Sequence, residues 1–275
     1  MLRKSELEHI EEILRQAAEQ ELRPRFLEVE TYLKADGSVL TEADLGMQAR
    51  VLHELESRWP AFTLLGEEME AGAQEALLQD RSAGLWVLDP LDGTSNFASG
   101  IPYFGVSLAL IDAEGVQLGL VLDPVRGECF SALRGQGAWL NGQPLLVKPR
   151  KSSLSGSMAM VDFKRLPAGL AQQLASGAPY RSQRSFGSVA LDWCWLAAGR
   201  VQLYLHGGAR LWDYAAGSLI FAEAGGTGGL YQDYRGTSQQ GFTLQPRIGL
   251  AAVGADLFEK WHAWIRARAD SPPTG

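Results

Sequence analysis

The stretch Trp86-Val-Leu-Asp-Pro-Leu-Asp-Gly-Thr-Ser-Asn-Phe97 joins an apolar run to two aspartates, a proline and a glycine. The apolar run predicts a buried strand that brings Asp89 to its carboxyl end, where Pro90 is expected to stop the strand from continuing as an inner member of a sheet. Asp89 and Asp92 would then share a turn, close enough to hold a hard cation, and the carbonyl of Leu91 would be a further oxygen ligand.

Small residues follow this pair of aspartates. Gly93, Thr94 and Ser95 could turn their backbone N–H groups toward an anion if a helix begins here. Aspartate, proline and glycine are also ordinary turn residues, so the segment by itself fits a simple turn equally well.

Two more carboxylates stand at the ends of expected elements. Glu67 follows a short strand, 62–65, and Gly66, and Asp213 opens a helix expected to run from Trp212 to Ala224. Alone, Glu67 reads as a solvated turn residue and Asp213 as a helix cap. With Asp89 and Asp92 they make a set of oxygen ligands of the kind that Mg²⁺ prefers.

The chain opens with two expected helices. Ser5 and Glu8 predict a capping box for the first, and Thr41 with Asp44 predicts the start of the second. The apolar positions of the second helix that we expect to face inward are Leu45, Ala49, Leu52 and Leu55. Segments 106–111 and 116–122 predict a hairpin, and beyond residue 158 strands and helices alternate, which predicts an α/β layered fold.

The composition of the chain argues against several classes of partner and of metal site. The 275 residues carry a net charge of −7, which argues against nucleic acid or an anionic membrane as the main partner. The two cysteines and four histidines form no zinc-binding pattern, so any metal would have oxygen ligands. The sequence shows neither a signal peptide nor an apolar run of membrane-spanning length, and we therefore expect a cytoplasmic protein.

Three segments together resemble the inositol-monophosphatase family of metal-dependent, lithium-sensitive phosphatases. They are Gly66-Glu67-Glu68, the Asp-Pro-x-Asp-Gly-Thr-x-Asn-Phe motif of 89–97, and the Trp-Asp-x-Ala-Ala-Gly motif that runs from Trp212 to Gly226. The resemblance spans about Lys34 to Gly226. It implies a five-layer αβαβα sandwich with an active site between residues 1–146 and 147–275, and it also implies a homodimer and inhibition by lithium.

The resemblance also implies roles for single residues. Two or three Mg²⁺ ions would be held by Glu67, Asp89, the Leu91 carbonyl, Asp92 and Asp213. The phosphate group of a small substrate would bind Gly93, Thr94 and Ser95, and Asp213 would also contact the substrate. Lys34, Asp44, Glu67 and Thr94 would position the attacking water. Asp44 is equally well explained as the capping partner of Thr41, and Lys34 as a solvated turn lysine.

Two positions, Gly187 and His206, bear on the identity of the substrate. Gly187 belongs to a segment that resembles the part of inositol phosphatases that approaches the sugar ring. Seven residues before Asp213, where those enzymes place a glutamate that binds ring hydroxyls, this chain has His206. The first candidate is myo-inositol 1-phosphate. The alternatives are 3'-phosphoadenosine 5'-phosphate, fructose 1,6-bisphosphate and histidinol phosphate, or a non-catalytic regulatory protein that binds a partner.

Overall fold

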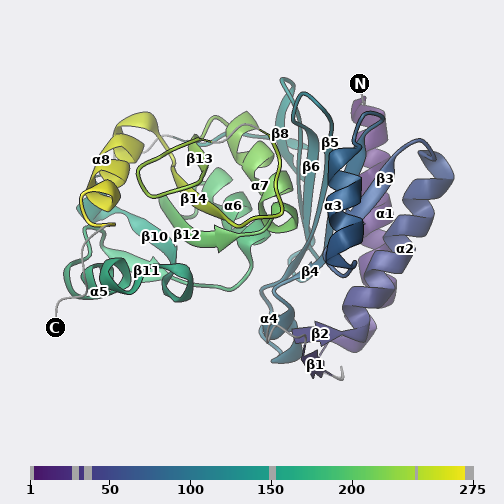
Figure 1. The fold of residues 1–275 in the computed structure, drawn as a ribbon, viewed down its shortest axis with the longest axis horizontal. Helices are drawn as coiled ribbons and strands as arrows, with labels where there is room; N and C mark the ends of the chain where they lie inside the picture. Colours follow the sequence, from purple (N-terminus) through teal and green to yellow (C-terminus); the bar gives the residue numbers. More distant parts are fainter. Residues whose placement is uncertain (1–2, 27–30, 34–38, 149–152, 239–240, 270–275) are drawn as a thin grey trace.

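The computed structural model describes residues 3–26, 31–33, 39–148, 153–238 and 241–269. These residues form two main β-sheets and three layers of helices, stacked in the order α, β, α, β, α (Figure 1). Helices α1 (Lys4–Glu21) and α2 (Glu42–Arg58) cover the outer face of the larger sheet. Helices α6 (Val189–Ala197) and α7 (Leu211–Glu223) lie between the sheets, and α5 (Ala168–Gly177) and α8 (Ala255–Arg266) cover the smaller one. The predicted αβαβα sandwich is confirmed.

The larger sheet is a nearly continuous meander. Its strands are ordered β3-β4-β5-β6-β7-β8-β9; only β3 and β4 are parallel, and β5 and β6 form the predicted hairpin. Their bounds are β3 Thr63–Gly66, β4 Leu85–Asp92, β5 Gly105–Ile111, β6 Val116–Asp123, β7 Glu128–Leu133, β8 Gly137–Leu140 and β9 Gln143–Leu145. Helix α3 (Ala71–Gln79) joins β3 to β4, and α4 (Thr94–Ala98) follows β4.

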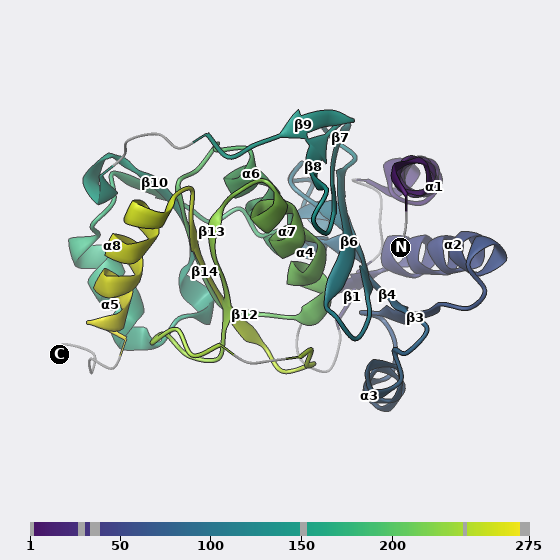
Figure 2. The ribbon, with the colours of Figure 1, turned by 90° about the horizontal axis from the view of Figure 1, so that it is seen from above.

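The smaller sheet has the order β11-β10-β12-β14-β13. Strand β10 is parallel to both of its neighbours, whereas β14 is antiparallel to β12 and β13. The bounds are β10 Met158–Asp162, β11 Ser182–Arg184, β12 Leu203–Ala209, β13 Thr227–Tyr231 and β14 Arg247–Ala252. A separate two-stranded sheet, β1 (Thr31–Leu33) with β2 (Val39–Thr41), leads into α2. Figure 2 shows the same layers from above.

Strand β4 illustrates how the layers are held together. Leu85 and Val87 pack into the cluster shared with α6 and α7, whereas Trp86 and Leu88 pack into the cluster beneath α1 and α2. Successive side chains of a strand point to opposite faces, so a sheet covered on both sides needs an uninterrupted apolar run. The sequence of β4 meets this need up to Asp89.

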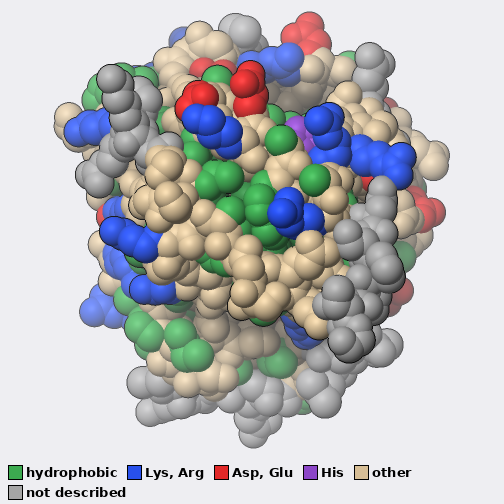
Figure 3. Space-filling model, turned by 90° about the vertical axis from the view of Figure 1, so that its left-hand side faces the viewer, with side chains coloured by type: hydrophobic (Ala, Val, Ile, Leu, Met, Phe, Trp, Pro, Cys, Tyr) green, Lys and Arg blue, Asp and Glu red, His purple; other side chains and the backbone are tan. Residues whose placement is uncertain are grey.

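The boundary expected at residues 146 and 147 stays a prediction. The larger sheet ends at Leu145 and the smaller one begins at Met158, yet one hydrophobic cluster contains side chains from both sheets. The outer face over α5 and α8 carries hydrophobic side chains near its centre with lysines and arginines around them (Figure 3).

Two expectations about the first helices were wrong. Helix α1 begins one residue before Ser5, and its first turn is capped by Glu6, whose Oε2 accepts a hydrogen bond from Arg3 N at 2.9 Å. In α2 the capping box of Thr41 and Asp44 is confirmed, but Leu45 is 48% exposed. Of the four positions expected to face inward, only Leu55 is buried; the buried apolar side chains are Ala43, Met47, Val51 and Leu55.

The expectation for Pro90 was also wrong. Strand β4 continues through Pro90 to Asp92 as an inner strand, with a register shift against β5 between Asp89 and Asp92. A bulge leaves a residue without a ladder partner, which is the setting in which a sheet tolerates proline.

Candidate active site

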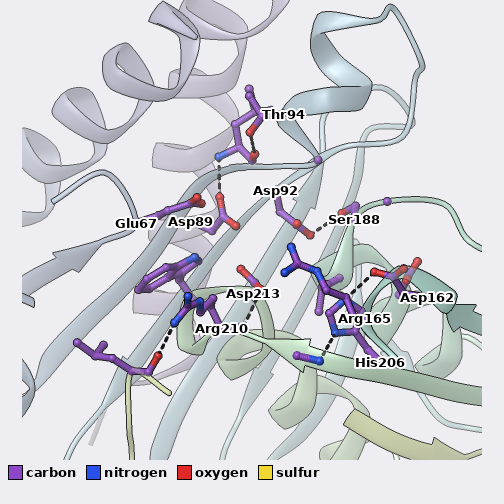
Figure 4. Close-up of a pocket in the computed structure, with 18 of the residues that line it drawn as sticks. Glu67, Asp89, Asp92, Thr94, Asp162, Arg165, Ser188, His206, Arg210 and Asp213 are labelled. Atoms are coloured by element: carbon purple, nitrogen blue, oxygen red, sulfur yellow. Dashed lines mark hydrogen bonds and ion pairs between the residues drawn. The ribbon is translucent and has the colours of Figure 1, made fainter. Parts of the chain in front are cut away.

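A pocket of about 570 Å³ opens where the carboxyl ends of β3 and β4 face the first turn of α7 and the smaller sheet (Figure 4). Most of the expected site residues line it: Glu67, Asp89, Leu91, Asp92, Gly93, Thr94, Gly187, His206 and Asp213. Asp44 and Ser95 do not line it, although Asp44 bonds to Thr94 and Ser95 is its neighbour on α4. Lys34 lies outside the described residues.

Two glutamines, Gln74 and Gln48, shape the turn that carries Glu67. Gln74 Nε2 donates to the carbonyls of Gly66 at 2.8 Å and Glu67 at 3.1 Å. A side chain at position 66 would collide with Gln48, whose Oε1 would lie 2.0 Å from the added Cβ. Because glycine leaves this room, Gln48 can accept a hydrogen bond from Glu68 N and fix the turn.

The end of β4 is held by its own side chains. Asp89 Oδ1 accepts a hydrogen bond from Leu91 N at 3.0 Å, and Thr94 Oγ1 lies 2.9 Å from the Leu91 carbonyl oxygen. Gly93 has a φ of 96°, and a Cβ there would lie 3.1 Å from the Tyr103 carbonyl. Glycine therefore permits the left-handed turn that joins β4 to α4.

The other two carboxylates are hydrogen-bonded at the first turns of the central helices α6 and α7. Asp92 Oδ2 accepts hydrogen bonds from Ser188 Oγ and Ala190 N, each at 2.6 Å, at the start of α6. Asp213 Oδ2 accepts one from Arg210 N at 2.8 Å, so this aspartate caps α7 and lines the pocket as well. Asp213 therefore has the position expected of a helix cap and also the position expected of a candidate metal ligand.

Three of these carboxyl groups share an unfavourable environment. Burial raises the pKa of Asp89 well above its usual value, with the charges of Glu67, Asp92 and Asp213 adding to the effect. Burial likewise raises the pKa of Asp92 to about 7 and that of Asp213 well above its usual value. Among the described residues, no Lys, Arg or His forms an ion pair with Asp89, Asp92 or Asp213. Buried carboxylates without a cation are costly, so this group has the chemistry of a cation site.

His206 is already engaged within the protein. Its Nε2 lies 3.2 Å from Asp162 Oδ2, and its Nδ1 accepts a hydrogen bond from Gly208 N at 3.2 Å. The two residues are register partners on β10 and β12, and His206 is only 6% exposed. Nδ1 therefore faces a donor, and Nε2 faces a carboxylate. Both nitrogens of His206 are thus occupied by protein groups.

Several residues of the pocket were missed by the sequence analysis: Asp162, Arg165, Asp192 and Arg210. Asp192 is a buried carboxyl in the apolar helix α6, hydrogen-bonded to Tyr103 Oη at 2.9 Å. A charged residue inside an apolar helical run is a signal that could have revealed it. Asp162 ends a strand, as Asp89 nearly does. For Arg165 and Arg210 the sequence gives no such signal.

The chain is similar to known proteins both in sequence and in structure. The model of the inositol monophosphatase family matches residues 4–269. A protein named Nus factor SuhB from Pasteurella multocida is 36% identical over 80% of this chain and 83% of its own length. Inositol monophosphatase 1 of Solanum lycopersicum is 35% identical over 70% of this chain and 72% of its own length. The solved structure of the IMPase of Thermotoga maritima is 26% identical, with a TM-score of 0.80 over 96% of this chain and 97% of that one. In the described residues no helix is both long and apolar enough to cross a membrane.

Proposed function

The chain belongs to the inositol monophosphatase family, and from this premise we propose that it is a Mg²⁺-dependent phosphomonoesterase acting on a small polyol or sugar phosphate. The observation that carries the proposal is the gathering of Glu67, Asp89, Asp92 and Asp213 around one pocket, beside Thr94. Three different parts of the chain supply these carboxylates, and bringing acidic groups together where they raise one another's pKa is costly unless a cation is bound.

The residues present fit Mg²⁺. Every donor is an oxygen, and the Leu91 carbonyl adds a neutral one. Within the described residues, no three acidic, His or Cys side chains converge on a single ion position. Mg²⁺ commonly takes one or two carboxylates and completes its shell with waters and substrate phosphate, so a set of carboxylates shared between two or three ions is compatible with this arrangement. When bound, such ions polarise the phosphoryl group, activate water and stabilise the leaving oxygen.

The chain's own groups would hold the substrate and the water. Thr94 Oγ1, supported by Asp44 Oδ1, would orient the attacking water together with Glu67, and Lys34 would assist. The N–H groups of Gly93, Thr94 and Ser95 would bind the phosphate oxygens at the start of α4. Gly187 and His206 border the side of the pocket that would receive the alcohol portion.

The first substrate candidate is myo-inositol 1-phosphate, and the other three phosphate esters remain alternatives. The homodimer, the inhibition by lithium and the cytoplasmic location implied above also stay predictions, as does the absence of nucleic acid among the partners.

A second candidate function comes from the names of relatives. Several of them, including the one from Pasteurella multocida, are named Nus factor SuhB. This favours a regulatory role through a binding partner, either besides hydrolysis or in place of it.

Phosphate release from a panel of phosphomonoesters, with and without Mg²⁺, tests the first candidate. The key variant is Asp92→Asn, and Asp256→Asn, an exposed carboxyl on α8 paired with Lys260, is the matched control. Mg²⁺-dependent turnover that is lost only in Asp92→Asn supports the proposal. Absence of turnover with every ester and every Mg²⁺ concentration contradicts it and leaves the binding role.

A further inference from the structure

Arg165 is a cationic pocket residue that the proposed chemistry leaves unused. It ends a short 3₁₀ turn, Phe163–Arg165, that directly follows β10. Figure 4 shows its guanidinium reaching from that wall toward Asp92 and Asp213. Among the described residues it makes no hydrogen bond and no ion pair through this group. An arginine presents five N–H donors in a rigid fork, and here all of them remain available.

The neighbouring polar groups on this wall are satisfied by the protein. Both ring nitrogens of His206 have partners, and the two oxygens of Asp162 accept from His206 and from Lys164 N. Arg210, to the other side of Asp213 in Figure 4, donates one hydrogen bond to the Leu244 carbonyl at 3.0 Å. A neutral ring hydroxyl would therefore find few groups here that lack a partner, whereas an anion would find Arg165.

Charge distribution fixes the orientation of a ligand. The phosphate to be cleaved belongs at the carboxylates, where cations can bind, because Gly93 and Thr94 lie there too. Arg165 comes from the end of β10, on the wall that would receive the alcohol portion, and its guanidinium points from there toward Asp92 and Asp213 (Figure 4). A planar guanidinium matches phosphate and carboxylate groups in a paired geometry that it cannot offer to a single hydroxyl.

We propose that the preferred substrate is a phosphomonoester whose alcohol portion carries a second anionic group, a phosphate or a carboxylate, and that Arg165 binds this group. The inference rests on the proposed phosphatase function and narrows its substrate class, away from an uncharged polyol.

The test compares esters that differ only in the second charge. Glycerol 2-phosphate is paired with 2-phosphoglycerate, and fructose 1-phosphate with fructose 1,6-bisphosphate, so that the two pairs separate a carboxylate from a phosphate. For each pair, kcat/KM is measured in wild type, Arg165→Gln, Arg165→Lys and Lys164→Gln. Lys164 is the matched control, because it is the exposed neighbour of Arg165 but does not line the pocket.

We expect wild type to prefer the doubly anionic ester of at least one pair by about tenfold or more, the value of a charged hydrogen bond. The preference should fall toward one in Arg165→Gln, persist in part in Arg165→Lys, and remain in Lys164→Gln. Equal kcat/KM values within both wild-type pairs overturn the inference, and so does a preference that survives Arg165→Gln. An equal loss for both members of a pair, accompanied by a higher Mg²⁺ requirement, assigns Arg165 to the carboxylate cluster instead and also overturns it.

Binding separates this inference from the proposed function. Titration calorimetry of the same ester pairs is carried out with Ca²⁺ in place of Mg²⁺, a cation that takes the same class of oxygen ligands with looser geometry. If no ester is hydrolysed, the phosphatase proposal fails, yet tighter binding of the doubly anionic member that depends on Arg165 still supports the anion site. Equal dissociation constants, or no binding of either ester, overturn it.

Discussion

Thr94 Oγ1 lies 3.1 Å from Asp44 Oδ1, a residue 50 positions earlier in the chain, and 2.9 Å from the Leu91 carbonyl oxygen. A hydroxyl has one proton, so it can donate to only one of these two acceptors at a time. The other oxygen of Asp44 is occupied by the Thr41 backbone and side chain at the start of α2. Asp44 therefore links a helix cap to the pocket through its two oxygens.

Replacing Asp44 should affect catalysis more than folding. In Asp44→Asn the amide can still accept from Thr41, but an NH₂ group facing Thr94 would turn the hydroxyl around. We expect kcat to fall roughly 100-fold, in line with losing the group that orients a general acid–base contact. The measurement is kcat at saturating Mg²⁺ together with the melting temperature.

Thr41→Ala is the control for Asp44. It removes the hydroxyl that accepts from Ala43 N at 3.2 Å and should cost about 1 kcal/mol of stability with little change in kcat. If Asp44→Asn instead loses stability and keeps its kcat, Asp44 is a capping residue only.

Removing the hydroxyl of Ser188 should weaken metal binding. Its hydrogen bond holds the pKa of Asp92 below the value that burial alone would give. In Ser188→Ala protons compete better with Mg²⁺, so the Mg²⁺ concentration for half-maximal activity should rise several-fold near pH 7, and the difference should shrink at higher pH. Ser153→Ala, which removes another N-cap hydroxyl far from Asp92 in the chain, is the control. Equal Mg²⁺ requirements in Ser188→Ala and wild type would refute the prediction.

Stability without metal should depend on the buried carboxyls. Burial raises the pKa of Asp92 from 3.8 to about 7, so the folded protein binds more protons at this site than the unfolded chain between about pH 4 and pH 7. The contribution of Asp92 to the free energy of unfolding therefore decreases as pH rises through this window and is constant above it. Asp89 and Asp213 change in the same direction.

The measurement is the difference in free energy of unfolding between wild type and Asp92→Asn, in a chelator, from pH 4 to pH 8. It should decrease with pH, and Mg²⁺ at about 100 times its dissociation constant should add about 2.7 kcal/mol to wild type at pH 8. A difference that increases with pH would mean that Asp92 is stabilised as an anion without metal.

Local patterns carried most of the sequence prediction. The apolar run before Asp89, the Thr41 cap and the 106–122 hairpin depend on neighbouring residues, and each is present in the structure. The expectations were wrong where contacts between residues far apart in the sequence determine the local structure. Leu45 is exposed because α2 turns the face of Asp44 and Met47 inward, toward Thr94 and the larger sheet. Pro90 stays in β4 because a bulge against β5 accommodates it.

The same distinction between local sequence patterns and distant contacts applies to the candidate site. The carboxylates could be found because each lies in a motif near one end of an element, but their environment could not. Nothing in the local sequence places Asp162 beside His206, since their pairing depends on two parallel strands more than forty residues apart. Arg165 belongs to no motif and enters the pocket only because β10 ends there.

The position of Asp213 depends on how closely α7 approaches the larger sheet, and Gly119 on β6 sets that approach. A Cβ at Gly119 would lie 2.6 Å from the Ala216 carbonyl oxygen and 3.0 Å from its Cα, both backbone atoms of α7. Because backbone cannot rotate away as a side chain can, Gly119→Ala must push the helix outward. We expect a loss of about 1–3 kcal/mol in the free energy of unfolding, the usual cost of overpacking.

Activity should fall as well, since a helix displaced by even a fraction of an ångström moves Asp213 relative to Asp89 and Asp92. Gly72→Ala is the control, because a Cβ there meets nothing within 4 Å in helix α3. It should raise stability by roughly 0.5–1 kcal/mol, the helix preference for alanine over glycine. The measurements are the free energy of unfolding by chemical denaturation and the rate of Mg²⁺-dependent phosphate release, for both variants. If Gly119→Ala keeps the wild-type stability and Mg²⁺ requirement, β6 and α7 can separate slightly without cost. Asp213 is then positioned only by the hydrogen bond that it accepts from Arg210 N.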